Sequence, residues 1–207
     1  LKSFHSKTLI SITKDQVSKL HVQLGEAHGK AYANLVMRLL RALFNFAAAQ
    51  YEDAKGQSLI TDNPTKRLSQ TRSWYRIEPR RSYIKAYELA DWYEAVAKLS
   101  NSTLRDYLLF ILFTGLRREE AARLKWSDVD LKAKTFLIPD TKNRYPHVLP
   151  LSDYLFALLK RRCPEKMNQY VFPGLGRVGY IVEPRKQMAK VIEVTNIQFT
   201  IHDLRRT

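Results

Sequence analysis

The chain has 207 residues, 45% of them hydrophobic, which is enough for one large domain or two small domains with their own cores. Its 35 Lys and Arg against 20 Asp and Glu give a formal net charge of +15, which favours a polyanion such as nucleic acid as partner; a basic surface kept for solubility is the alternative. Apolar runs are too short for a membrane span and the single cysteine, Cys163, excludes an internal disulfide, so we expect a cytoplasmic protein without membrane association.

Two helices are expected near the N-terminus. Thr13 and Gln16 form a capping-box pattern that opens the first helix, and Gly25 is suited to end it. In residues 28–50 the following apolar residues recur at helical spacing: Leu35, Val36, Leu39, Leu40, Leu43 and Phe46. These patterns predict a helical domain over residues 1–65.

The polar side of the second helix is a candidate DNA contact. Its polar residues recur at helical spacing opposite much of the apolar stripe, and they are Lys30, Asn34, Arg38 and Arg41. A helix face that is only solvated is the alternative explanation.

Residues 66–81 are predicted to be a basic linker, because they lack the periodicity of a helix or a strand. Trp74 and Tyr75 lie among its cations, as in a strap that crosses phosphates and sugars, and a solvated loop is the alternative. The candidate DNA-binding residues of this linker are Arg72, Arg76, Arg80 and Arg81.

The remaining residues, 82–207, predict a second domain. Helices are expected at residues 88–99, 102–115, 118–126 and 153–162. Two short β-rich runs, residues 135–140 and 145–152, are joined by TKNR as a hairpin, and their prolines confine the strands to a sheet edge or keep them short. The predicted fold class is therefore mainly α with a small antiparallel β-sheet (α+β).

The run GLGRVG at residues 174–179 fits the dinucleotide-binding fingerprint G-x-G-x-x-G. That fingerprint requires a preceding strand and a βαβ unit, and Pro173 stands where the strand would end. We interpret the run as a surface loop and expect no nucleotide cofactor.

A small group of cations and proton donors beside turns are candidates for holding an anion. Arg117 follows TGL at a helix start, and Lys142 lies at the hairpin tip. Thr200 and Asp203 form a capping-box pattern, which predicts a helix with His202 and Arg205 on one face. Each of these residues alone is usually an ordinary surface charge.

In combination they resemble the catalytic domain of the tyrosine recombinase, or phage integrase, family. TGLRREEAARLKWSDVD, residues 114–130, is similar to the family's first box, with Arg117 in the place of the first catalytic arginine and Glu120 in that of a supporting acid. TKN puts Lys142 in the place of the family's hairpin lysine, and HDLRRT supplies its His-x-x-Arg as His202 and Arg205. Residues 1–65 resemble the family's helical core-binding domain more loosely, and 82–207 its catalytic domain.

The resemblance implies a site-specific recombinase that breaks and rejoins double-stranded DNA through a 3′-phosphotyrosyl intermediate, to integrate or excise a mobile element. The two arginines would stabilise charge on the phosphate oxygens, Lys142 would protonate the leaving 5′-oxygen, and His202 would act as acid or base. No metal ion or cofactor is expected, because the covalent intermediate keeps the bond energy. Expected partners are double-stranded DNA, further copies in a tetramer on the DNA, and a DNA-bending accessory protein, all in a bacterial or phage-infected cell.

The family's nucleophilic tyrosine follows its His-x-x-Arg, whereas all eleven tyrosines of this sequence precede His202. We therefore assign the nucleophile to no residue and expect that this chain lacks a C-terminal segment, binds DNA and does not cut it. Two alternatives stay open: a catalytically inactive integrase-like regulator that binds DNA, and a basic protein that binds RNA or the ribosome.

Overall fold

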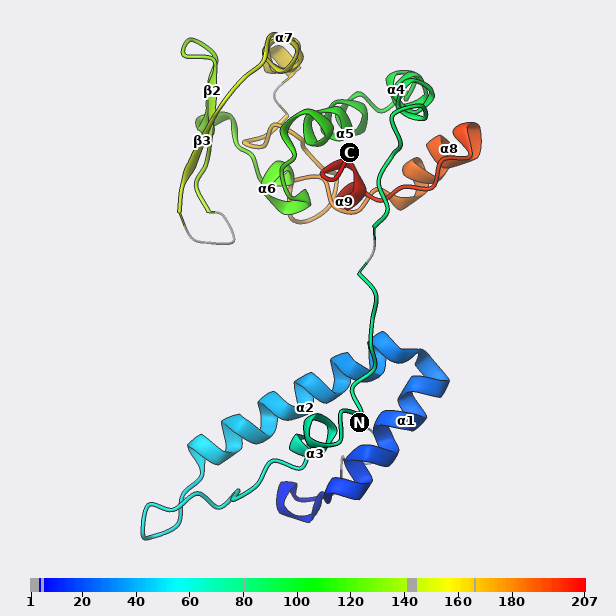
Figure 1. The fold of residues 1–207 in the computed structure, drawn as a ribbon. Helices are drawn as coiled ribbons and strands as arrows, with labels where there is room; N and C mark the ends of the chain where they lie inside the picture. The colour runs from blue at the N-terminus through cyan, green and yellow to red at the C-terminus, as the bar shows by residue number, and fades with distance from the viewer. Residues whose placement is uncertain (1–3, 5, 80, 141–144, 166) are drawn as a thin grey trace. The chain divides into compact units, whose positions relative to one another are not determined.

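A computed structural model describes residues 4, 6–79, 81–140, 145–165 and 167–207 of the chain. The described residues are mainly helical with a three-stranded antiparallel sheet, so the predicted fold class is confirmed. The chain divides into two compact units, residues 1–80 (unit 1) and 81–207 (unit 2), which Figure 1 draws in blue to cyan and in green to red. Within the described ranges, no helix has both the length and the apolar character that crossing a membrane requires.

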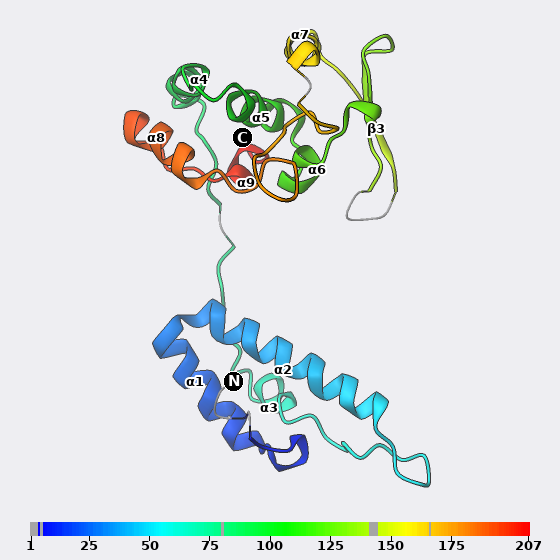
Figure 2. The same cartoon turned by 180° about the vertical axis from the view of Figure 1, so that it is seen from behind.

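Unit 1 is built on two long helices that lie side by side (Figures 1 and 2). α1 (Lys14–His28) begins at the predicted capping box of Thr13 and Gln16, and α2 (Lys30–Gln50) follows directly. The predicted end of α1 at Gly25 is wrong, because this glycine lies inside the helix. A Cβ atom there would lie 2.5 Å from the hydroxyl of Tyr75, so glycine makes room for that ring.

The face that α2 buries overlaps only in part with the predicted apolar stripe. Its buried apolar residues are Ala33, Met37, Leu40, Phe44 and Ala47. Of the predicted stripe, Leu40 is thus buried and Val36 is partly buried against the same core. The remaining residues of the stripe are exposed, namely Leu35, Leu39, Leu43 and Phe46. The helix carries two adjacent apolar stripes, and Val17 of α1 and Leu68 share a core with only one of them.

Part of the predicted linker is folded onto unit 1. Residues Lys66–Gln70 form the short helix α3, and Leu68 is buried in the core of the unit. The rings of Trp74 and Tyr75 pack against His21, with centroids 5.9 and 4.4 Å away. These two aromatic residues therefore stabilise unit 1, although they lie in the segment without helix or strand that follows α3.

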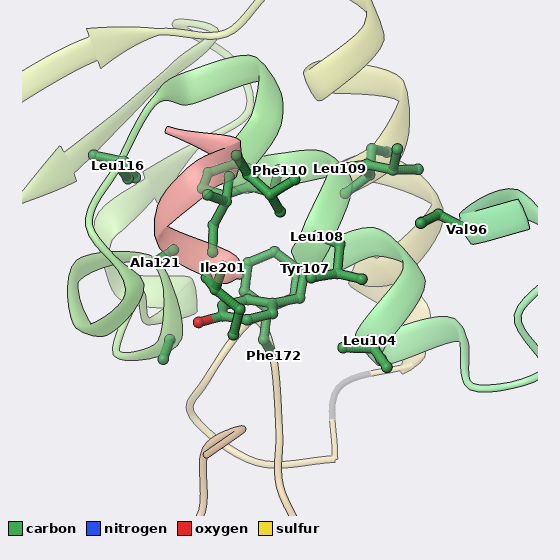
Figure 3. Close-up of a cluster of buried hydrophobic side chains, with 14 of the residues drawn as sticks. Val96, Leu104, Tyr107, Leu108, Leu109, Phe110, Leu116, Ala121, Phe172 and Ile201 are labelled. Atoms are coloured by element: carbon green, nitrogen blue, oxygen red, sulfur yellow. The ribbon is translucent and has the colours of Figure 1, made fainter. Parts of the chain in front are cut away.

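Unit 2 is organised around a buried helix, α5 (Ser102–Thr114), which ends at Gly115 in the left-handed conformation with φ +63°. Figure 3 shows Tyr107 and Phe110 of α5 in one cluster with Phe172 and Ile201. The helices that contact α5 are α4 (Leu89–Ala97), α6 (Arg118–Ala122), α7 (Asp153–Arg162) and α9 (Ile201–Leu204), and α8 (Arg185–Thr195) packs on α4.

The sheet has the strand order β1 (Val129–Asp130), β2 (Thr135–Ile138), β3 (His147–Pro150), with antiparallel pairing throughout. β3 is an edge strand and β2 is central but only four residues long, which agrees with the prediction that prolines confine these strands to an edge or keep them short. Residues 141–144 between β2 and β3 include Lys142 and lie outside the described residues. Short 3-10 helices are formed by Leu9–Ser11, Trp126–Asp128 and Cys163–Glu165.

Candidate active site

Arg117 is placed by the turn between α5 and α6. Its backbone is extended and caps the N-terminus of α6. Both its backbone N–H and its guanidinium Nη1 donate hydrogen bonds to the carboxylate of Glu120, at 2.8 and 2.7 Å. The side chain of Glu120 is 10% exposed and that of Arg117 is 43% exposed. A nearly buried acid thus orients a cation that still reaches solvent.

α9 brings the second arginine to the same carboxylate. The helix opens at the predicted capping box, where the Thr200 backbone N–H and Oγ1 donate to Asp203 Oδ2 at 2.9 and 2.7 Å. Arg205, at the C-terminal end of the helix, places Nη1 4.0 Å from Glu120 Oε2. Arg117 and Arg205, far apart in the sequence, therefore share Glu120.

His202 is exposed on α9 and lines a pocket of about 590 Å³. Arg118, Glu183 and Arg185 contribute polar groups to this pocket. The rest of the lining is mainly apolar and includes Met188, Ile192, Phe199 and Ile201. His202 thus lies at a surface where a proton donor, cations and apolar side chains meet.

Arg117 lines a second pocket, of about 700 Å³. Arg123 and Lys125 add further positive charge to its wall, and neither was among the predicted site residues. Asp140, the last described residue before the hairpin tip, also lines it. Lys142 itself lies outside the described residues, and its role stays a prediction.

Tyr107 contacts α6, since its hydroxyl donates a 2.9 Å hydrogen bond to the Arg118 carbonyl. Burial raises the pKa of this phenol far above its ordinary value, although the Arg118 cation opposes the shift. A buried phenol that stays protonated is poorly suited to be a nucleophile.

Asp203 has a second role that the sequence did not reveal. Burial by itself would raise its pKa, but hydrogen bonds from Ser82 and Thr200, with the Arg206 cation nearby, lower the pKa below its ordinary value. The capping pattern with Thr200 was visible in the sequence. The contact with Ser82, 121 positions earlier, carries no local signal.

Three of the candidate DNA contacts on α2 are on its surface. Lys30 and Arg38 are exposed, and the Lys30 ammonium lies 5.9 Å from the centre of the Tyr75 ring. The Arg41 guanidinium lies 5.2 Å from the Trp74 ring and donates to Ser69 Oγ at 2.7 Å. Two of these cations are thus braced by aromatic rings.

Asn34, predicted to contact DNA, is buried instead. Its Oδ1 accepts hydrogen bonds from His21 Nε2 at 3.0 Å and from the Tyr75 backbone N–H at 3.3 Å. Its Nδ2 donates to the Tyr75 carbonyl at 2.8 Å. The side chain is engaged inside unit 1, so we correct its assignment to a structural one.

The linker candidates have different surroundings. Arg72 is exposed and adopts a left-handed backbone conformation with φ +54°. Arg76 forms a 2.9 Å ion pair with Glu78, and Arg81 is exposed. Arg80 lies outside the described residues.

Comparison with known proteins gives consistent matches. The sequence profile described as the phage integrase family matches residues 83–207. Prophage integrase IntF of Escherichia coli strain K12 is 35% identical over 126 residues, which cover 58% of this chain and 27% of IntF. Prophage integrase IntZ of the same strain is 26% identical over 171 residues, which cover 81% of this chain and 40% of IntZ. The chain thus spans less than half the length of these two relatives.

Solved structures share the fold at low identity. XerH site-specific recombinase bound to its difH substrate aligns with TM-score 0.73 and 21% identity over 97% of this chain and 59% of that chain. A lambda integrase tetramer bound to a Holliday junction aligns with TM-score 0.71 and 23% identity, over 95% and 58%. The family profile covers more than half of the sequence and includes both arginines that share Glu120. The chain belongs to the phage integrase family.

Proposed function

We propose that this chain is the phosphate-handling part of a site-specific DNA recombinase. The enzyme breaks and rejoins double-stranded DNA through a 3′-phosphotyrosyl intermediate and thereby integrates or excises a mobile element. The observation that carries the proposal is the pair of cations, Arg117 and Arg205, held on the single carboxylate of Glu120. Membership of the phage integrase family supports it.

The paired arginines suit the chemistry of a phosphodiester. Negative charge grows on the non-bridging oxygens as the nucleophile attacks, and a guanidinium can hold two oxygens in its planar fork. Each guanidinium carries five N–H donors, so contact of one nitrogen with Glu120 leaves others to face a phosphate. The side chains of Arg117 and Arg205 are 43% and 36% exposed, which keeps them accessible to DNA.

The remaining steps need proton transfer and a nucleophile. Lys142 donates a proton to the departing 5′-oxygen, and His202 assists as acid or base and as a hydrogen-bond donor to the phosphate. A tyrosine attacks phosphorus, and we assign that role to none of the eleven tyrosines of this chain. The bond energy stays in the phosphotyrosyl link, so rejoining requires neither ATP nor a metal ion.

Unit 1 and the linker hold the duplex in this proposal. The contacts come from cations of α2 and of the following segment, namely Lys30, Arg38, Arg41, Arg72, Arg76, Arg80 and Arg81. The complete recombinase assembles as a tetramer on its site, and an accessory protein bends the DNA.

The test uses the chain extended at its C-terminus by the tyrosine-bearing segment of a family member (the extended chain). Duplexes that the 207-residue chain binds are first selected from a random pool and prepared as nicked suicide substrates. These substrates are incubated with the extended chain, and the covalent protein–DNA product is quantified on a denaturing gel. Arg117→Lys or Arg205→Lys should lower the rate by about 10²- to 10³-fold, because a point charge replaces an aligned fork. DNA affinity should change little.

Arg177→Lys, in the exposed loop at residues 174–179, is the matched control and should cleave at the unchanged rate. If both arginine variants form the covalent product at the wild-type rate, Arg117 and Arg205 are not catalytic residues. A strict requirement for Mg²⁺ would indicate a nuclease-like mechanism. DNA binding by the extended chain without any covalent product would instead favour the inactive regulator.

A further inference from the structure

α9 is too short to hold its own orientation. It has four residues, and a single helical turn is unstable without tertiary contacts. Ile201 and Leu204 anchor it in the core of unit 2, because both side chains are buried. Two buried apolar side chains on one face do not prevent the helix from rotating about the line that joins them. Other contacts must therefore fix its rotation.

Hydrogen bonds to the start of unit 2 supply those contacts. Asp203 divides its carboxylate: Oδ2 accepts from Thr200, and Oδ1 accepts a 2.7 Å hydrogen bond from Ser82 Oγ. A second bond runs from the Ile84 backbone N–H to Thr207 Oγ1 at 3.0 Å. Residues 82–84, directly after the unit boundary, are therefore tied to Asp203, between His202 and Arg205, and to Thr207, two residues after Arg205.

We propose that Ser82 is a positioning residue for the phosphate site, because its hydrogen bond to Asp203 fixes the rotation of α9 that brings Arg205 to Glu120. His202 and Arg205 are three residues apart and share a helix face, so one rotation moves both. The Arg205–Glu120 separation of 4.0 Å is at the limit of ion-pair contact, and a small rotation breaks it. This inference rests on the proposed function of the two arginines.

The local geometry separates this role from simple helix capping. The cap is made by Thr200 and Asp203 Oδ2, which remain when the Ser82 hydroxyl is removed. Ser82 is itself exposed, so Ser82→Ala leaves no cavity in the core. Its effect should therefore be on the orientation of α9 more than on the stability of unit 2.

The experiment titrates inorganic phosphate into the ¹⁵N-labelled 207-residue chain and follows the guanidinium Nε–H signals of Arg117 and Arg205 by NMR. In Ser82→Ala the apparent Kd for phosphate at Arg205 should rise about fivefold or more, as expected when one hydrogen bond to a charged group is lost. Ser82→Thr keeps the hydroxyl and should restore the Kd. Tyr83→Phe removes a hydroxyl from the neighbouring exposed residue and is the matched control.

Each outcome decides the inference. A raised Kd in Ser82→Ala with unchanged Tm, rescued in Ser82→Thr, supports it. An unchanged Kd, or the same loss in Ser82→Thr or Tyr83→Phe, overturns it while the proposed function stands. Failure of both arginine signals to respond to phosphate in the wild-type chain overturns the proposed site and this inference together.

Discussion

Replacing Glu120 tests the shared carboxylate most directly. Glu120→Gln keeps the shape of the side chain and one acceptor oxygen for the Arg117 backbone N–H, but it removes the charge. The ion pair with Arg117 Nη1 at 2.7 Å and the 4.0 Å contact with Arg205 both lose their electrostatic part. The two guanidinium groups then repel each other without an intervening anion.

The expected loss follows from these distances. A hydrogen bond to a charged group contributes about 1.5–3 kcal/mol. The Arg205 contact has a gross attraction of about 4 kcal/mol at an effective dielectric constant near 20, and desolvation of the carboxylate offsets most of it. We expect unit 2 to lose about 2–4 kcal/mol of unfolding free energy.

Glu119 offers a matched control on the same helix. It pairs with Arg118 and Arg123 at 2.7 and 3.3 Å, but its side chain is 48% exposed. Exposed pairs contribute about 0–1 kcal/mol each, so Glu119→Gln should cost at most about 2 kcal/mol, less than is expected for Glu120→Gln.

The assay is urea unfolding followed by tryptophan fluorescence in a Trp74→Phe background, which leaves Trp92 and Trp126 of unit 2 as reporters. DNA affinity is measured in parallel and should not fall, because an acid has been removed from a basic site. Equal unfolding free energies for Glu120→Gln and Glu119→Gln would refute the shared-carboxylate argument.

Three further predictions concern DNA contact, the interior of unit 1 and pH. Changing Lys30, Arg38 and Arg41 together to Ala should flatten the dependence of DNA affinity on salt by up to about 0.9 in log–log slope per lost phosphate contact, and an unchanged slope would place the contact elsewhere. Asn34→Ala should lower the unfolding free energy of unit 1 by about 1–3 kcal/mol and leave that slope unaltered, whereas a flattened slope would return Asn34 to the DNA interface. The folded-state pKa of Asp203 is lowered, so its ionised form contributes stability that is complete above the ordinary pKa of 3.8 and is lost as the pH falls through the folded-state value. The difference in unfolding free energy between the wild-type chain and Asp203→Asn should accordingly shrink below pH 3.8, and a constant difference in acid would contradict this role.

Local signals in the sequence determined where many elements lie and which family the chain belongs to. The capping boxes at Thr13 and Thr200 opened α1 and α9 where expected, because a cap satisfies backbone donors within three residues. α7 spans Asp153–Arg162, the range predicted from periodicity. The order of the arginine, lysine and His-x-x-Arg motifs was sufficient to recognise the family, since motif spacing survives when the overall identity is low.

Only the tertiary structure decided which surfaces are covered and which distant residues meet. Periodicity could not tell which apolar stripe of α2 faces α1, nor that Asn34 would turn inward to hold Tyr75, because both depend on the segment that packs against the helix. The sharing of Glu120 by Arg117 and Arg205, and the bond from Ser82 to Asp203, join positions widely separated along the chain. Such contacts form only when the tertiary structure folds, and no local sequence pattern predicts them.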